Sequence, residues 1–185
     1  MVWTKQICQK VLRLFKTDEA VAAVEFALIV PAMLVLYMGS IEVSQVISVD
    51  RKMSAATGAL GDLVAQSEAQ LSTSILDDYF TAVGLIMTPY SANNLKQLVT
   101  LVFIDDQGDA SVVWSVGNNG ATAKDVDSSY IVPSQITAVS LETYLVVSEA
   151  QLPYQPWGGY VLPGSFNLYK QFFYMPRFGG QIQLI

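Results

Sequence analysis

The carboxylate of Glu25 is the side chain with the clearest potential for chemistry, because it is the single charge in the apolar run of residues 20–41. A carboxylate at the centre of a bilayer costs up to about 3 kcal/mol, so a residue of this kind usually marks a functional contact. The simpler alternative is that Glu25 extends to the lipid headgroups without a further role. Pro31 lacks a backbone donor and predicts a bend or a loosened turn, unless it is an ordinary membrane-helix proline.

Most catalytic chemistry is excluded by the residue types that the sequence lacks. It contains no histidine and one cysteine, Cys8, so a histidine-based triad, an intramolecular disulfide and a cysteine-ligated zinc site are all ruled out. Serine is frequent, but no Ser-x-x-Lys motif supplies a lysine base. Asp105, Asp106 and Asp109 could bind calcium, although carboxylates in a hairpin turn are more often solvated. We predict a protein that is not an enzyme and that holds no metal or cofactor.

Charge and hydropathy divide the chain into three parts. The net charge is −6, with 14% charged and 52% hydrophobic residues, which argues against nucleic-acid binding and against a fully soluble protein. As a helix, residues 20–41 would span about 33 Å, against about 30 Å for the hydrocarbon core of a bilayer. Four basic residues and no acidic one in residues 1–16 favour a cytoplasmic N-terminus. We predict a basic cytoplasmic leader (1–20), a transmembrane helix (21–49) and an exported domain (50–185).

Alternatives remain open for the two N-terminal parts. The apolar run could be the core helix of a soluble domain, although core helices rarely run this long without a polar face. Apolar residues in 1–16 recur at three- and four-residue spacing, so this segment is either an amphipathic helix on an anionic membrane surface or a basic leader with incidental apolar residues. On the predicted topology, Cys8 is a reduced thiol in the cytoplasm.

Beyond the apolar run, the pattern predicts an α+β fold in which a long N-terminal helix packs against a small antiparallel sheet. Helical spacing of apolar residues continues to about residue 70, and a second helix is expected over 73–87. Strands are expected at residues 97–104, 111–116, 138–148, 166–174 and 181–185. Residues 153–164 are rich in proline and glycine and predict a loop. Its Tyr154, Trp157 and Tyr160 are a candidate partner surface, with local packing as the alternative.

The sequence VAAVEFALIVP after a short basic leader resembles the TadE/TadG-like family, the minor pseudopilins of the bacterial tight-adherence (Flp) pilus and relatives of type IV pilins. In that family, a prepilin peptidase cuts after a small residue, usually glycine, and a glutamate and an aromatic residue follow at the fifth and sixth mature positions. The resemblance implies a cut between Ala20 and Val21, with Glu25 fifth and Phe26 sixth. It also implies that the α-amine freed on Val21 pairs with Glu25 and sets the register of the helix.

The resemblance continues more weakly in the last forty residues, in a Tyr-x-Pro segment (154–156) and an aromatic–Pro–Arg segment (172–177). It implies a pilin-like fold and a non-catalytic protein of the bacterial inner membrane that helps to initiate, cap or adapt a pilus. The implied partners are prepilin peptidase, other pilin and pseudopilin subunits, pilus assembly proteins and membrane lipid, with no nucleic acid. The alternative is an uncleaved, single-pass anchored binding module, periplasmic or extracellular, in which Glu25 is incidental.

Overall fold

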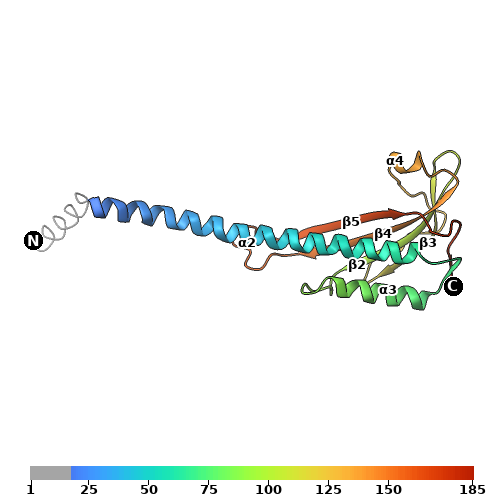
Figure 1. Cartoon of the computed structure of the whole chain (residues 1–185), viewed down its shortest axis with the longest axis horizontal. Coiled ribbons are helices and arrows are strands. Elements are labelled where there is room, and N and C mark those ends of the chain that lie inside the picture. The colour runs from blue at the N-terminus through green and yellow to red at the C-terminus, as the bar shows by residue number, and fades with distance from the viewer. Residues whose placement is uncertain (1–17) are drawn as a thin grey trace, which may run out of the picture. The chain divides into compact units, whose positions relative to one another are not determined.

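The computed structural model describes residues 18–185, which fall into two compact units. The helix–loop unit contains the described residues up to Ser44 and the loop Pro156–Pro163. The sheet unit contains Gln45–Gln155 and Gly164–Ile185. One continuous helix, α2 (Asp18–Ala65), contributes its first part to the helix–loop unit and its remainder to the sheet unit (Figure 1).

The sheet unit is built on a four-stranded antiparallel sheet with the strand order β3-β2-β4-β5. Its strands are β2 (Lys96–Ile104), β3 (Ala110–Asn118), β4 (Thr143–Tyr154) and β5 (Phe166–Tyr174). The helices of this unit besides α2 are α3 (Thr73–Ile86) and the single turn α4 (Ser134–Thr137). Two short strands, β1 (Gln70–Leu71) and β6 (Gln183–Leu184), pair in parallel outside the main sheet. The predicted α+β class, a long N-terminal helix with a small antiparallel sheet, is confirmed.

The main core lies between one face of the sheet and the helices α2 and α3, which run along it in Figure 1. The buried residues of α2 form a stripe at three- and four-residue spacing: Val49, Met53, Ala56, Leu60 and Val64. The same cluster includes Leu76, Phe80 and Val83 of α3 and Val99, Leu101 and Val146 of the sheet. Each fully buried side chain of this size contributes about 1.5–3 kcal/mol, so this stripe fixes the face that α2 presents to the sheet.

A smaller core covers the opposite face of the sheet. It contains Val102 and Ile104 of β2 and Leu145 and Val147 of β4, with Tyr130 from the connection between β3 and β4 packed over them. The backbone N–H of Tyr130 donates to the carbonyl of Ala110 at 2.8 Å, which ties this connection to the edge strand β3. The segment that leads from β3 to β4 is therefore part of the packed structure.

Gly61 allows α2 to approach β4 and β5 closely. A Cβ atom at this position would lie 2.5 Å from Cδ2 of the Tyr174 ring and 2.6 Å from Oγ of Ser148. That hydroxyl donates a hydrogen bond of 2.9 Å to the backbone carbonyl of Thr57 inside the core. Any side chain at residue 61 would separate the helix from the strands and stretch this bond.

The aromatic–Pro–Arg segment holds the end of α2. The backbone N–H of Arg177 donates to the carbonyl of Ala65 at 2.9 Å and so satisfies one of the acceptors that a helix end leaves free. The Arg177 guanidinium lies 2.6 Å from Asp62 Oδ1, but both side chains are largely exposed, so the ion pair itself contributes little. Together with Tyr174 beside Gly61, these contacts give the segment a structural role.

Two predicted element boundaries are wrong, and one predicted strand belongs to a second sheet. The helix ends at Ala65, and not near residue 70, because the carbonyls of Ala65 and Ala69 accept from the backbone of the C-terminal segment. The third main strand starts at Thr143, and not at residue 138, because residues 138–140 donate backwards into the turn of α4. The last strand, expected as a fifth strand, pairs with β1 outside the main sheet.

We expect Gly61→Ala to lower the free energy of unfolding by about 1–3 kcal/mol, because the new methyl group overpacks the contact with Tyr174 and Ser148. Gly84→Ala in α3 is the matched control, since its Cβ would meet Cβ of Ala92 at an ordinary 3.8 Å. This change should stabilise the protein by about 0.5–1 kcal/mol through helix propensity. Urea unfolding of the full chain in detergent, followed by near-ultraviolet circular dichroism, measures both. Equal stabilisation by the two alanines would contradict the close approach.

Candidate functional site

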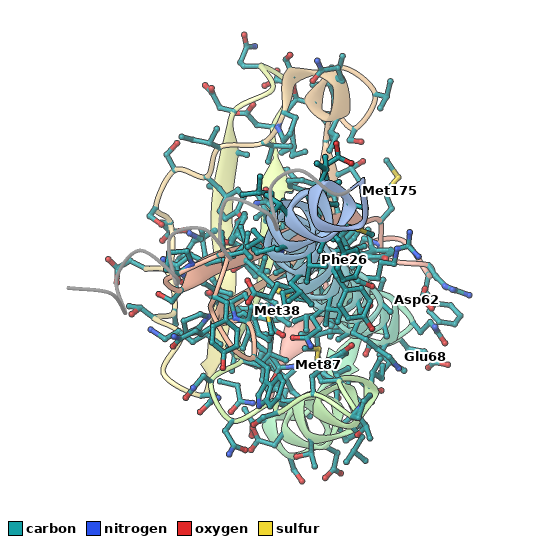
Figure 2. The ribbon with its side chains drawn as sticks, turned by 90° about the vertical axis from the view of Figure 1, so that its left-hand side faces the viewer. Phe26, Met38, Asp62, Glu68, Met87 and Met175 are labelled. Carbon is teal, nitrogen blue, oxygen red and sulfur yellow. The ribbon has the colours of Figure 1, made fainter. Side chains whose placement is uncertain are left out.

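The first part of α2 lies in the one described helix that is long and apolar enough to cross a membrane. The apolar window has a mean hydropathy of 2.2, and none of it is buried inside the structure. Phe26 is 69% exposed and Leu36 is 73% exposed. Figure 2 looks along this helix and labels Phe26 and Met38 on it. A helix that is apolar on every side needs lipid or other helices around it, so α2 indicates membrane anchoring.

The residues of the predicted cleavage and assembly motif lie on this exposed part of α2. Val21 and Glu25 are one turn apart, at a spacing that brings Cβ atoms within about 5–6 Å in a helix. Glu25 and Phe26 are both exposed. Pro31 lies inside α2, which continues as helix beyond it, and the predicted bend there stays a prediction. Ala20 belongs to the helix, but its side chain, the leader over residues 1–16 and Cys8 lie outside the described residues.

Glu42 is a buried carboxylate of the helix–loop unit to which no sequence pattern pointed. It is 2% exposed and accepts three hydrogen bonds from successive backbone N–H groups of the loop Pro156–Pro163. The N–H of Tyr160 lies 2.7 Å from Oε1, and those of Val161 and Leu162 lie 3.2 and 2.8 Å from Oε2. Successive N–H groups that converge on one anion form a backbone nest. This arrangement, the Glu42 clamp, fixes the loop to α2.

Two glycines leave room for the Glu42 clamp. Gly158 has φ +100°, and a Cβ atom there would lie 2.9 Å from the Tyr160 ring and 3.4 Å from Glu42 Oε1. Gly39 of α2 is packed against the loop, because a Cβ atom there would lie 3.3 Å from Cγ1 of Val161. A larger residue at either position would push the loop away from the carboxylate.

The exposed aromatic residues of this loop are Trp157 and Tyr160, at 83% and 72% exposed. The prediction that Tyr154 shares the loop with them is wrong. Tyr154 is the last residue of β4, where it pairs with Phe166 and packs partly buried against the main core of the sheet unit. The strand reaches it because β5 continues to pair with β4 through Pro153. Trp157 and Tyr160 remain as the candidate partner surface.

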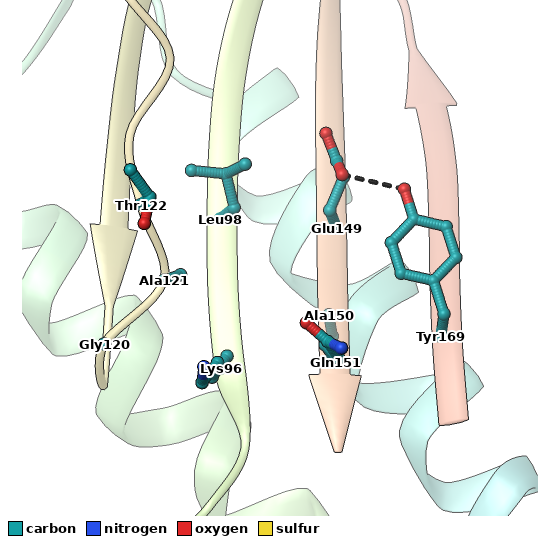
Figure 3. A pocket seen from close by; sticks show the side chains of 9 residues that line it. All are labelled: Lys96, Leu98, Gly120, Ala121, Thr122, Glu149, Ala150, Gln151 and Tyr169. Carbon is teal, nitrogen blue, oxygen red and sulfur yellow. Dashed lines mark hydrogen bonds between the residues drawn. The ribbon is translucent and has the colours of Figure 1, made fainter. Parts of the chain in front are cut away.

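A pocket of about 250 Å³ lies on the sheet unit beside Glu149 of β4 (Figure 3). Its lining includes Lys96 of β2, Tyr169 of β5 and the backbone turn that follows β3. The Glu149 carboxylate accepts hydrogen bonds from the hydroxyls of Tyr130 and Tyr169, the second at 2.7 Å, and Lys124 Nζ lies 3.9 Å away. These neighbours satisfy both oxygens of the carboxylate.

The two phenols beside Glu149 act as hydrogen-bond donors. Burial, the hydrogen bond to Glu149 and its negative charge raise the pKa of Tyr130 and Tyr169 well above the ordinary value of 10.0. A phenol that keeps its proton is neither a base nor a nucleophile near neutral pH. Gln171 donates to the Tyr130 hydroxyl at 2.9 Å and completes the network. The cluster therefore anchors the connection between β3 and β4 to the sheet.

The turn considered for calcium is organised by one of its own carboxylates. Asp105 Oδ1 accepts the backbone N–H groups of Gln107 and Asp109 at 2.9 and 2.8 Å, as in an Asx-turn. Within residues 18–185, no three His, Cys, Asp or Glu side chains are grouped so that they could hold a metal ion. The Asp105 carboxylate thus has a local structural role.

We expect Tyr130→Phe to destabilise the protein by about 1–3 kcal/mol near neutral pH, because it removes a donor to a largely buried carboxylate. Because folding raises the pKa of Tyr130 above the ordinary value of 10.0, the contribution of this phenol to the free energy of unfolding is fully present below pH 10. It is lost as the pH rises further. The difference in free energy of unfolding between wild type and Tyr130→Phe should therefore shrink above pH 10. Urea unfolding between pH 8 and 11 measures it. Tyr79→Phe, in α3, is the control, and a constant difference across this range would contradict the role of Tyr130.

The first part of α2 is similar to a known protein family. Residues 20–59 match a family model described as TadE-like protein. Neither a curated protein nor a solved structure matches the chain. The matched segment contains Glu25, Phe26 and Pro31 and also Glu42, and it covers most of α2. The resemblance predicted from the sequence is confirmed over residues 20–59, which are similar to the TadE-like family model.

Proposed function

We propose that the protein is a minor pseudopilin that a prepilin peptidase processes between Ala20 and Val21 and that assists the initiation, capping or adaptation of a tight-adherence pilus. The observation that carries the proposal is Glu25, the single charge in the exposed apolar run of residues 20–41, which lies within the segment that matches the TadE-like family model. The N-terminus lies in the cytoplasm before cleavage, and the sheet unit lies in the periplasm. The protein acts by contacts with other subunits and not by catalysis.

Charge pairing at the start of α2 gives Glu25 its role. Cleavage frees an α-amine on Val21, which is largely positively charged at neutral pH. In a medium of low dielectric, this charge and the Glu25 carboxylate attract each other strongly, and the attraction offsets part of the cost of removing each from water. The partner amine belongs to the same chain, one turn away, or to a neighbouring subunit. A pair between subunits fixes how far one helix slides past the next, whereas a pair within one chain lowers the cost of keeping Glu25 in the membrane.

The apolar surface of α2 supplies the rest of the assembly contact. Large side chains from Phe26 to Met38 are exposed on the described helix, and lipid covers them before assembly. In a fibre, neighbouring helices replace that lipid, and Pro31 loosens the backbone where the helices pack. Trp157 and Tyr160 offer a second exposed surface for membrane or protein contacts.

The alternative function is an uncleaved anchored module whose exported domain binds a partner. It shares the membrane helix and the sheet unit with the pseudopilin and differs in the first residue of the mature chain. On this alternative, Glu25 pairs with no freed amine.

N-terminal sequencing of the protein purified from its native membrane tests the processing. We expect a chain that begins at Val21, and a chain that begins at Met1 in cells that lack prepilin peptidase. Ala20→Gly should be cut at least as completely, because glycine fits the usual requirement for a small residue. A first residue of Met1 in both strains would exclude processing and favour the anchored module.

Glu25→Gln tests the charge pair separately from membrane anchoring. Glutamine keeps the size of the side chain and removes its charge, so the variant should stay in the membrane fraction but lose co-purification with other pilus subunits. Glu68→Gln is the control, because Glu68 is an exposed residue of the sheet unit. Undiminished co-purification of Glu25→Gln would contradict the assembly role.

A further inference from the structure

We infer that the loop Pro156–Pro163 enters the headgroup region of the membrane, with Trp157 and Tyr160 as its anchoring side chains. The inference rests on the proposed anchoring of α2 and adds a second lipid contact, made by a segment far along the chain. All the residues that carry it belong to the helix–loop unit.

The position of the loop along α2 is the first argument. Glu42 holds the loop backbone, and Val161 packs at Gly39, so the loop lies beside residues 39–42 of the helix. The apolar run ends at residue 41, after a rise of about 33 Å, close to the thickness of the hydrocarbon core. A helix that fills this core brings residues 39–42 to its outer edge. The loop is therefore held where hydrocarbon gives way to headgroups.

The composition of the loop is the second argument. None of its eight residues is charged, and the only side chains with a polar group are those of Trp157 and Tyr160. Trp157 and Tyr160 are mostly exposed, and these two residue types accumulate at membrane interfaces because their rings are apolar and their N–H or O–H groups find water. The loop also continues the exposed apolar surface of α2, where Tyr37 is 66% and Met38 43% exposed. This continuity favours lipid over a separate protein partner.

The Glu42 clamp is the third argument. Irregular backbone is tolerated near hydrocarbon only when its N–H and C=O groups are satisfied within the protein. The carboxylate accepts the N–H groups of Tyr160, Val161 and Leu162, which water would otherwise have to solvate. An unsatisfied N–H in an apolar medium costs several kcal/mol, so the clamp removes the main obstacle to burying this loop in the interface.

Depth-dependent fluorescence quenching tests the inference. The full chain is reconstituted into vesicles of phosphatidylethanolamine and phosphatidylglycerol with bromine near the headgroup end or near the middle of the acyl chain. Because the sequence has three tryptophans, the emission of Trp157 is the difference between a Trp3→Phe chain and a Trp3→Phe/Trp157→Phe chain. We expect this emission to be quenched more strongly by the shallow bromine than by the deep bromine.

The outcomes separate the inference from the proposed anchoring. A chain that floats with the vesicles while Trp157 stays unquenched keeps the anchoring and overturns the lipid contact, which leaves a protein partner for the loop. Stronger quenching by the deep bromine also overturns the interfacial depth. A chain that does not float with the vesicles overturns both proposals.

The Glu42→Gln variant tests whether the Glu42 clamp positions the loop. A glutamine at residue 42 presents an N–H₂ group to donors that need an acceptor, so Glu42→Gln should reduce shallow quenching of Trp157 by about twofold or more. Glu68→Gln makes the same change outside the helix–loop unit and should leave quenching unchanged. Full quenching in Glu42→Gln would show that the clamp does not position the loop, and would overturn that step of the inference.

Discussion

The structure depends on one helix that meets two kinds of surroundings. In the sheet unit, α2 buries a stripe from Val49 to Val64 and approaches the strands closely at Gly61. In the helix–loop unit, the same helix is exposed and apolar on every side, apart from the surface next to the loop. A helix in water needs one buried face, and a helix in lipid needs none. The change of pattern within α2 thus marks where its surroundings change.

Local patterns in the sequence predict much of the fold, because helix and strand periodicity are properties of neighbouring residues. The buried stripe around Met53 and Leu60 and the strand Phe166–Tyr174 agree with prediction. The errors arise where distant segments compete for backbone groups. Arg177 takes the carbonyl at Ala65, and the C-terminal residues pair with β1, neither of which a local pattern contains.

For the candidate site too, the sequence predicts the feature that depends on neighbouring residues and misses the one that depends on distant residues. Glu25 is evident because a charge within an apolar run is a local anomaly, and its spacing to Ala20 is a local motif. Glu42 follows the same run and looks like an ordinary flanking charge. Its donors lie 118 to 120 residues later in the chain, so only the three-dimensional structure reveals the clamp.

Glu149, Glu42 and Glu25 differ in which groups lie around their carboxylates, and this difference distinguishes the two structural glutamates from the one proposed for function. Phenol and ammonium groups surround Glu149, and three backbone N–H groups surround Glu42, so both carboxylates hold parts of the same chain together. Glu25 is exposed on an apolar helix. On the proposed function, the group that stabilises this carboxylate in lipid is the freed amine of Val21, in the same chain or in a neighbouring subunit. Of the three carboxylates, Glu25 is therefore the one that we propose for contacts between subunits.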